Sequence, residues 1–122
     1  MGKKILVIDD SQTVCQQVAL VLDQGGFETL EAADGADGLE LIQKTPDIAM
    51  VLCDINMPRM NGLEMVEAVQ KSGRSIPIVM LTTEGQPQLI DRAKKAGVKG
   101  WIVKPFKGDL LLAAVKKVTG EK

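Results

Sequence analysis

The sequence predicts an α/β domain in which a five-stranded parallel sheet carries helices on both of its faces, the doubly wound arrangement. Five short apolar runs alternate along the chain with longer segments in which apolar residues recur at helical spacing. The longest runs are apolar throughout, which is typical of strands buried on both faces of a parallel sheet. Strands that alternate with helices in this way are joined by right-handed crossover connections.

The first strand is expected at residues 4–8, which read KILVI and end directly before the acids Asp9 and Asp10. A helix beginning near Ser11 follows, and Gly25-Gly26 stops its pattern. The apolar face of this helix is formed by Val14, Val18, Val21 and Leu22.

A weaker strand is expected at residues 27–32, and the next helix opens at Asp34-Gly35 and ends before Pro46. The central strand occupies residues 48–53 and stops at a single carboxylate, Asp54. This acid can either cap the turn that follows or belong to a site, because ligands of open α/β sheets bind at the carboxyl ends of the strands.

The second half of the chain repeats the alternation. Asn61, with Glu64 three residues later, starts a helix that runs to Gly73. Residues 76–81 form the fourth strand, which Thr82-Thr83 closes.

A helix over residues 86–96 then precedes the fifth strand, residues 100–103, which ends at Lys104-Pro105. The last helix has a continuous apolar stripe of Leu110, Leu111, Ala114, Val115 and Val118.

Composition limits the classes of function. The 122 residues suit a single domain, residues 1–122, and a net charge of −1 provides no basic footprint for nucleic acid or an anionic membrane. No apolar run suits a signal peptide or a membrane span, so a cytoplasmic protein is expected. Cys15 and Cys53 have no metal-ligand spacing and are expected to be buried and reduced. Since the chain has no His, any bound metal would be a hard cation held by oxygen.

The strands should deliver five reactive side chains to one edge of the sheet. Asp9 and Asp10 come from the first strand, Asp54 from the third, Thr82 from the fourth and Lys104 from the fifth. Three close carboxylates repel one another unless a cation neutralises them. Mg²⁺ suits such a group, because it takes oxygen ligands and keeps waters that a substrate phosphate can replace.

These motifs resemble the receiver domains of two-component response regulators, most closely the single-domain chemotaxis (CheY-like) type. The resemblance covers nearly the whole chain. It includes the Asp9-Asp10 pair, Asp54 with Asn56-Met57-Pro58 and Asn61-Gly62 after it, Thr82, and Lys104-Pro105-Phe106. It implies a flavodoxin-like sheet with strand order 2-1-3-4-5.

The resemblance also implies roles for individual residues. Asp54 would be the phosphoryl acceptor, with Lys104 and Thr82 contacting phosphoryl oxygens. Asp10, Asp54 and the backbone carbonyl of Asn56 would hold Mg²⁺, and Asp9 would assist through a water. The Lys104-Pro105 peptide would be cis.

Further positions bear on the lifetime and the output of the signal. Asn56 and Glu84 resemble positions that tune dephosphorylation, and they can equally be ordinary polar residues of surface loops. Thr82 and Trp101 would form the switch, although Trp101 stands where Tyr or Phe is commoner and Thr83 where a smaller residue is usual.

The function expected from this resemblance is a stand-alone, monomeric response regulator that a sensor histidine kinase phosphorylates. It would not be an enzyme beyond its own phosphorylation and dephosphorylation. Its partner, a flagellar motor switch protein or another effector, would dock on the face made by the fourth helix, fifth strand and fifth helix.

A phosphorelay intermediate is one alternative function. An aspartyl-phosphate phosphatase is another, but Asn56 stands where that chemistry needs a second acid. A flavin protein is disfavoured, because the turn DDSQT is acidic where a phosphate cradle needs Gly.

Overall fold

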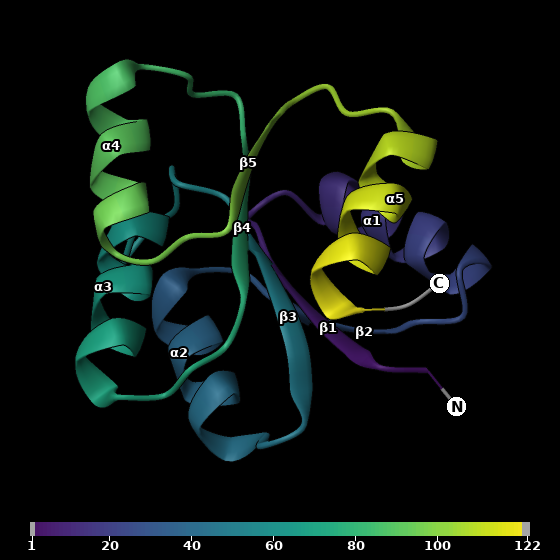
Figure 1. Cartoon of the computed structure of the whole chain (residues 1–122), viewed down its shortest axis with the longest axis horizontal. Coiled ribbons are helices and arrows are strands. Elements are labelled where there is room, and N and C mark those ends of the chain that lie inside the picture. The colour runs from purple at the N-terminus through teal and green to yellow at the C-terminus, as the bar shows by residue number, and fades with distance from the viewer. Residues whose placement is uncertain (1, 121–122) are drawn as a thin grey trace.

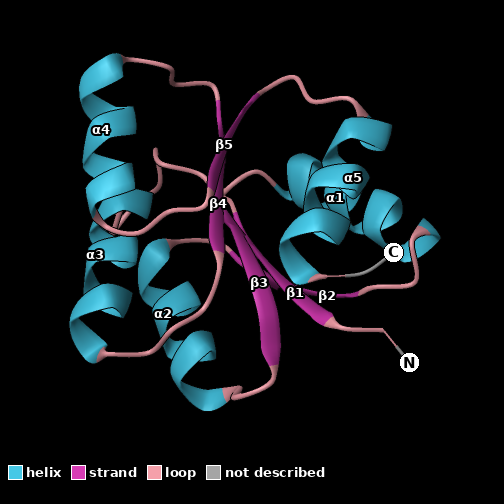
Figure 2. Ribbon diagram, in the orientation of Figure 1, coloured by secondary structure: helices cyan, strands magenta, loops and turns pink. Residues whose placement is uncertain are grey.

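A computed structural model describes residues 2–120 and shows a central parallel sheet between two helical layers (Figure 2). Its strands are β1 (Lys4–Ile8), β2 (Glu28–Ala32), β3 (Ile48–Cys53), β4 (Ile78–Thr82) and β5 (Gly100–Val103). Its helices are α1 (Gln12–Gln24), α2 (Gly35–Lys44), α3 (Gly62–Ser72), α4 (Pro87–Lys95) and α5 (Gly108–Thr119). Within these residues the strands pair in the order β2-β1-β3-β4-β5, so the expected fold class and strand order are confirmed.

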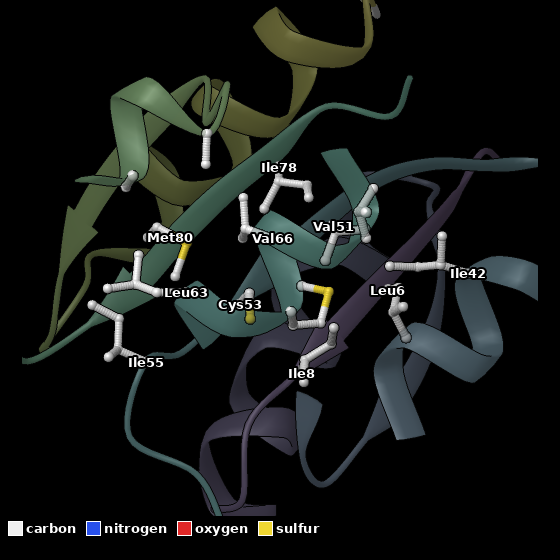
Figure 3. Close-up of a cluster of buried hydrophobic side chains, with 14 of the residues drawn as sticks. Leu6, Ile8, Ile42, Val51, Cys53, Ile55, Leu63, Val66, Ile78 and Met80 are labelled. Carbon is white, nitrogen blue, oxygen red and sulfur yellow. The ribbon is translucent and has the colours of Figure 1, made fainter. Parts of the chain in front are cut away.

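The sheet separates two hydrophobic clusters. Helices α2, α3 and α4 cover one face, and α1 and α5 cover the other (Figure 1). Leu6 and Ile8 of β1 point into the first cluster, whereas Ile5 and Val7 point into the second. Figure 3 shows the first cluster, where Leu6 and Ile8 lie with residues of β3, β4 and α3. Because successive strand residues face opposite sides, the central strands of a sheet covered on both faces must be apolar along most of their length.

Three helices begin at the capping residues that the sequence suggests. The side chains of Ser11 and Asp34 accept the backbone N–H groups of Val14 at 3.3 Å and Asp37 at 2.9 Å. At the start of α3, Asn61 and Glu64 form the full reciprocal capping box, with bonds of 2.9 and 3.0 Å. Each cap satisfies backbone donors that the first helical turn leaves unpaired. These caps therefore fix where the chain turns from a loop into a helix.

The expected bounds of the fourth strand are wrong at both ends, since β4 covers residues 78–82 and not 76–81. Pro77, just before the strand, has no N–H to donate, so only its carbonyl takes part in pairing with β3, where it accepts the N–H of Val51 at 2.9 Å. At the other end, Thr82 is paired with Val103 of β5. Thr82 is therefore the last residue of the strand and not the first residue after it.

Two other elements are shorter than expected. Strand β2 begins at Glu28, because the N–H of Phe27 donates to Leu22 at 3.0 Å and closes the end of α1. Helix α4 loses one residue at each end and carries Pro87 in its first turn, where a missing N–H costs no helical bond. The longest helix, α1, has 13 residues, and no helix within residues 2–120 is long and apolar enough to cross a membrane.

Both cysteines are buried free thiols, as the sequence predicts. Burial raises the pKa of the Cys15 thiol to about 11. The Cys53 thiol lies in the core and donates to the backbone oxygen of Asp54 at 3.2 Å. Both residues therefore act as packing groups.

Gly62 allows α3 to start directly against the end of β3. Its N–H donates to the carbonyl of Ile55 at 2.9 Å, and an added Cβ would collide with the backbone oxygen of Asp54. This close approach sets the path of the chain immediately after the central strand.

Gly62→Ala should therefore lower the free energy of unfolding by about 1–3 kcal/mol, the usual cost of overpacking. Gly85→Ala is the matched control, because a Cβ there would meet nothing within 4 Å. Urea unfolding of both variants checks this prediction. Equal stabilities for the two variants would contradict the close approach at Gly62.

Candidate functional site

Three carboxylates converge at the carboxyl edge of the sheet. Asp9 and Asp10 follow β1, and Asp54 follows the adjacent strand β3, whose end is joined to β1 by the bond from Asp54 N–H to Ile8 at 2.9 Å. One carboxylate oxygen from each acid lies within 4.8 Å of the others. The predicted convergence of the acids is therefore confirmed.

Lys104, which directly follows β5, places a positive charge beside these acids. Its ammonium lies 2.7 Å from Asp9 Oδ2 and 3.4 Å from Asp54 Oδ2, and its side chain is only 14% exposed. Burial alone would lower the pKa of Lys104, but the hydrogen bond to Asp9 and the charge of Asp54 raise it above the ordinary value. Lys104 is therefore a positively charged partner of two acids at neutral pH.

Asp9 has an unfavourable environment in spite of this ion pair. Burial raises its pKa, and the charge of Asp54 adds to the effect. The bonds from Lys104 and from the Ser11 N–H, the latter at 2.9 Å, offset the rise only in part. The ionised form of Asp9 is thus under electrostatic strain in the folded protein.

Asp54 is almost buried and is held in one orientation. Its Oδ1 accepts the N–H of Ile55 at 2.7 Å, and Oδ2 faces Lys104. The neighbouring acid, Asp10, is exposed and so accessible from solvent. Asp54 thus presents a fixed carboxylate beside a more accessible one.

Thr82 and Glu84 connect the site to the loop between β4 and α4. The hydroxyl of the fully buried Thr82 accepts the N–H of Glu84 at 3.2 Å. The Glu84 carboxylate accepts the side-chain amides of Asn56 at 3.2 Å and Gln86 at 2.9 Å. The two positions suggested to tune dephosphorylation are therefore in contact.

Trp101 is joined to the same residue. Its indole N–H donates to the backbone oxygen of Glu84 at 2.9 Å, and its half-buried ring packs against the cluster beneath α2, α3 and α4. The Lys104-Pro105 peptide is cis, as the resemblance implied. Every predicted site residue thus lies at this edge or in direct contact with a residue there.

Sequence reasoning did not identify Gln86 or Arg59. Gln86 was only the expected start of a helix, and Arg59 only part of a loop. Arg59 has a positive φ of 66° and reaches Asp34 Oδ2 and Asp37 Oδ1, both at 3.3 Å. The Pro58-Arg59 pair indicated a turn in the sequence. It gave no indication of the partners of Arg59, because Asp34 and Asp37 precede it by more than twenty residues.

The donor set fits a hard divalent cation. The three grouped acids offer only oxygen atoms, and the nearby Cys53 is a buried thiol whose pKa burial raises far above its ordinary value. Carboxylate oxygens are the ligands that Mg²⁺ prefers, whereas soft metals prefer thiolate or imidazole. A bound divalent cation would therefore reduce the repulsion among the three carboxylates and neutralise part of the charge of a phosphate group.

Comparisons with known proteins agree with this arrangement. The sequence model of the response regulator receiver domain matches residues 5–116. The chain is 40% identical over 120 residues to the chemotaxis protein CheY homolog of Campylobacter jejuni, which covers 96% of this chain and 92% of that protein. The solved chemotaxis protein CheY4 of Vibrio cholerae has a TM-score of 0.89 at 38% identity, covering 97% and 99% of the two chains. The CheX-CheY-BeF3-Mg complex of Borrelia burgdorferi has a TM-score of 0.89 at 28% identity, covering 94% and 87%.

The raised pKa of Asp9 predicts a gain in stability on removing its charge. A folded-state pKa above the unfolded value means that ionised Asp9 lowers the free energy of unfolding at neutral pH. Asp9→Asn should raise that free energy by about 1 kcal/mol at pH 7 in EDTA, the usual scale of a single substitution. The gain should shrink as the pH falls through the raised pKa, because the wild-type carboxyl then becomes neutral.

Urea unfolding across this pH range checks the expectation. Asp23→Asn, on the exposed surface of α1, is the control and should change the free energy of unfolding by less than about 0.5 kcal/mol. A gain for Asp9→Asn that did not depend on pH would exclude the charge of Asp9 as its cause.

Proposed function

Because this chain belongs to the response regulator receiver domain family, we propose that it is a signalling protein controlled by phosphorylation of Asp54. Phosphorylation and partner binding are general in this family, and CheY-like receivers are signalling proteins and not classical enzymes. The main support within this chain is the group of Asp9, Asp10 and Asp54 beside Lys104. We expect this chain to be cytoplasmic and its phosphodonor to be a sensor histidine kinase, because the chain has no His of its own to carry a phosphoryl group.

In the proposed reaction, a carboxylate oxygen of Asp54 forms a bond to phosphorus while the phosphorus–nitrogen bond of a phosphohistidine breaks. The bonding electron pair leaves with the imidazole nitrogen. Lys104, already 3.4 Å from Asp54, neutralises charge on a phosphoryl oxygen. The hydroxyl of Thr82 donates to another phosphoryl oxygen. The chain thereby assists the transfer of the phosphoryl group from its donor to its own Asp54.

We assign the Mg²⁺ ligands to Asp10, Asp54 and the backbone carbonyl of Asn56, with Asp9 acting through a water. The close group of carboxylate oxygens supports this assignment, and a similar receiver has been solved with BeF3 and Mg. Bound Mg²⁺ would supply positive charge to the phosphoryl oxygens during transfer. Asp9 remains next to Lys104 and orients its ammonium.

The signal would leave the site through Thr82 and Trp101. The Thr82 hydroxyl now accepts the Glu84 N–H at 3.2 Å, and Trp101 donates to the carbonyl of the same residue. A phosphoryl group that draws Thr82 toward Asp54 would disturb the Glu84 backbone, and with it the anchor of the indole. The result is a population shift between two packings of the ring.

An effector would dock on the face of α4, β5 and α5. A cavity of about 440 Å³ lies between β5 and α5, with Trp101 in its wall. A smaller one of about 80 Å³ lies on the other side of Trp101, against α4. Lys94, Lys99 and Lys117 line these cavities, so the face suits an amphipathic segment with acidic residues. In a chemotaxis pathway that effector would be the flagellar motor switch protein.

The acceptor assignment predicts that a small acyl phosphate with Mg²⁺ adds one phosphoryl group to the wild-type chain and none to Asp54→Asn. Intact-mass spectrometry measures both proteins under the same conditions. Asp47→Asn, an exposed acid at the opposite edge of the sheet, is the control and should be modified like the wild type. Equal modification of Asp54→Asn would overturn the assignment.

The proposed switch predicts a change in tryptophan emission. Trp101 is the only Trp and the chain has no Tyr, so the emission reports this one ring. Phosphorylation should shift its wavelength or its accessibility to a quencher, because the bond to Glu84 is disturbed. Thr82→Ala should reduce the shift, whereas Thr83→Ala, on an exposed neighbour, should not. Complete phosphorylation with unchanged emission would rule out a switch through this ring.

A further inference from the structure

The loop between β3 and α3 contains an unfavourable backbone conformation. Arg59 has a φ of 66°, and around it the carbonyl of Pro58 accepts the N–H of Met60 at 2.8 Å. A bond across three residues with a positive central φ is the pattern of a rare and strained γ-turn. Gly or Asn would adopt this conformation at lower cost than Arg.

The arginine side chain reaches the start of α2. Its Nε lies 3.3 Å from Asp34 Oδ2 and its Nη2 lies 3.3 Å from Asp37 Oδ1. The Asp34 side chain is only 7% exposed, and its other oxygen already caps the helix through the Asp37 N–H. A planar guanidinium can serve two carboxylates at once, which a single ammonium does poorly.

A backbone contact reinforces this connection. The N–H of Gly35 donates to the carbonyl of Met60 at 2.9 Å, and an added Cβ on Gly35 would lie 2.5 Å from that oxygen. The loop and the start of α2 are thus in direct contact. We call these two ion pairs and the backbone bond the α2 latch.

The α2 latch holds one end of a loop whose other end is the acidic site. The loop begins at Asp54, and Ile55 is buried and bonded to the N–H of Gly62. Asn56 is exposed and stands three residues before Arg59. The position of its carbonyl therefore depends on both ends of the loop.

We infer that Arg59 is a positioning residue, which through the α2 latch holds the carbonyl of Asn56 where it can bind Mg²⁺. The inference rests on the proposed function, because that function assigns the carbonyl to the metal. Neither Arg59 nor Asp34 touches the ion in this arrangement. Their effect on Mg²⁺ affinity is transmitted by the backbone of the loop.

Because Arg59 and Asp34 carry opposite charges, their substitution distinguishes a positioning role from a direct effect of charge on Mg²⁺ binding. Neutralising Arg59 removes a positive charge near an acidic site, which by itself would strengthen Mg²⁺ binding. Neutralising Asp34 removes a negative charge, which by itself would weaken it. If the α2 latch positions the ligand, both substitutions weaken binding.

The test is calorimetric titration of EDTA-stripped protein with MgCl₂. The variants are Arg59→Asn, Asp34→Asn and the double variant. Asn tolerates a positive φ at position 59 and still caps a helix at position 34, so all three variants should retain the fold in circular dichroism. We expect each single variant to weaken Mg²⁺ binding about tenfold, the lower end of effects for outer partners of metal ligands. The double variant should be no weaker than Arg59→Asn, because that single substitution already removes both ion pairs of the latch.

Two further variants complete the design. Arg59→Lys keeps the charge but cannot reach both carboxylates as well, so its affinity should lie between those of Arg59→Asn and the wild type. Asp10→Asn removes a proposed ligand and should weaken binding whether or not the latch matters. Opposite signs for Arg59→Asn and Asp34→Asn, or unchanged affinity in both, would overturn the role of Arg59. Unchanged affinity in Asp10→Asn would instead overturn the proposed metal site.

Discussion

Asp9, Asp10 and Asp54 are crowded together at one edge of the sheet, and their mutual repulsion governs the chemistry of the site. Adjacent parallel strands that end together must place their terminal side chains together, and here the three carboxylates lie within 4.8 Å. Lys104 offsets part of the repulsion, but burial still keeps the pKa of Asp9 raised. The chain therefore retains a locally unfavourable charge group that a cation and a phosphoryl group can stabilise.

At this edge of the sheet, rigid strands meet loops that can change conformation. The central strands β1, β3 and β4 are buried between two hydrophobic clusters, so the strand ends that lead to Asp9, Asp54 and Thr82 are fixed. The loops after β3 and β4 carry the groups that must respond to phosphorylation. Glu84 joins these loops, because it bonds Asn56, Gln86 and the indole of Trp101. A change at Asp54 therefore has a short physical path to the face of α4, β5 and α5.

Most of the fold could be predicted from local patterns. Wholly apolar runs identified strands covered on both faces, and the caps at Ser11, Asp34 and Asn61 identified helix starts. The errors at β4 and β2 came from backbone hydrogen bonds just before each strand. Pro77, which precedes β4, has no N–H and pairs only through its carbonyl with Val51, and the N–H of Phe27 is used to close the end of α1 at Leu22. Local propensity contains no information on such partners, so element bounds were less well predicted than element types.

The order of residues along the chain is enough to predict which side chains meet at the acidic edge, because the ends of neighbouring parallel strands bring Asp54, Thr82 and Lys104 together whatever path the loops take. How those groups are paired depends on contacts that form only in the folded chain. The bonds between Trp101 and Glu84 and between Arg59 and Asp34 join residues 17 or more positions apart, and in each pair one residue, Glu84 or Arg59, lies on an irregular loop. Loop paths depend on packing and side-chain contacts without a regular period, so no sequence pattern specifies them.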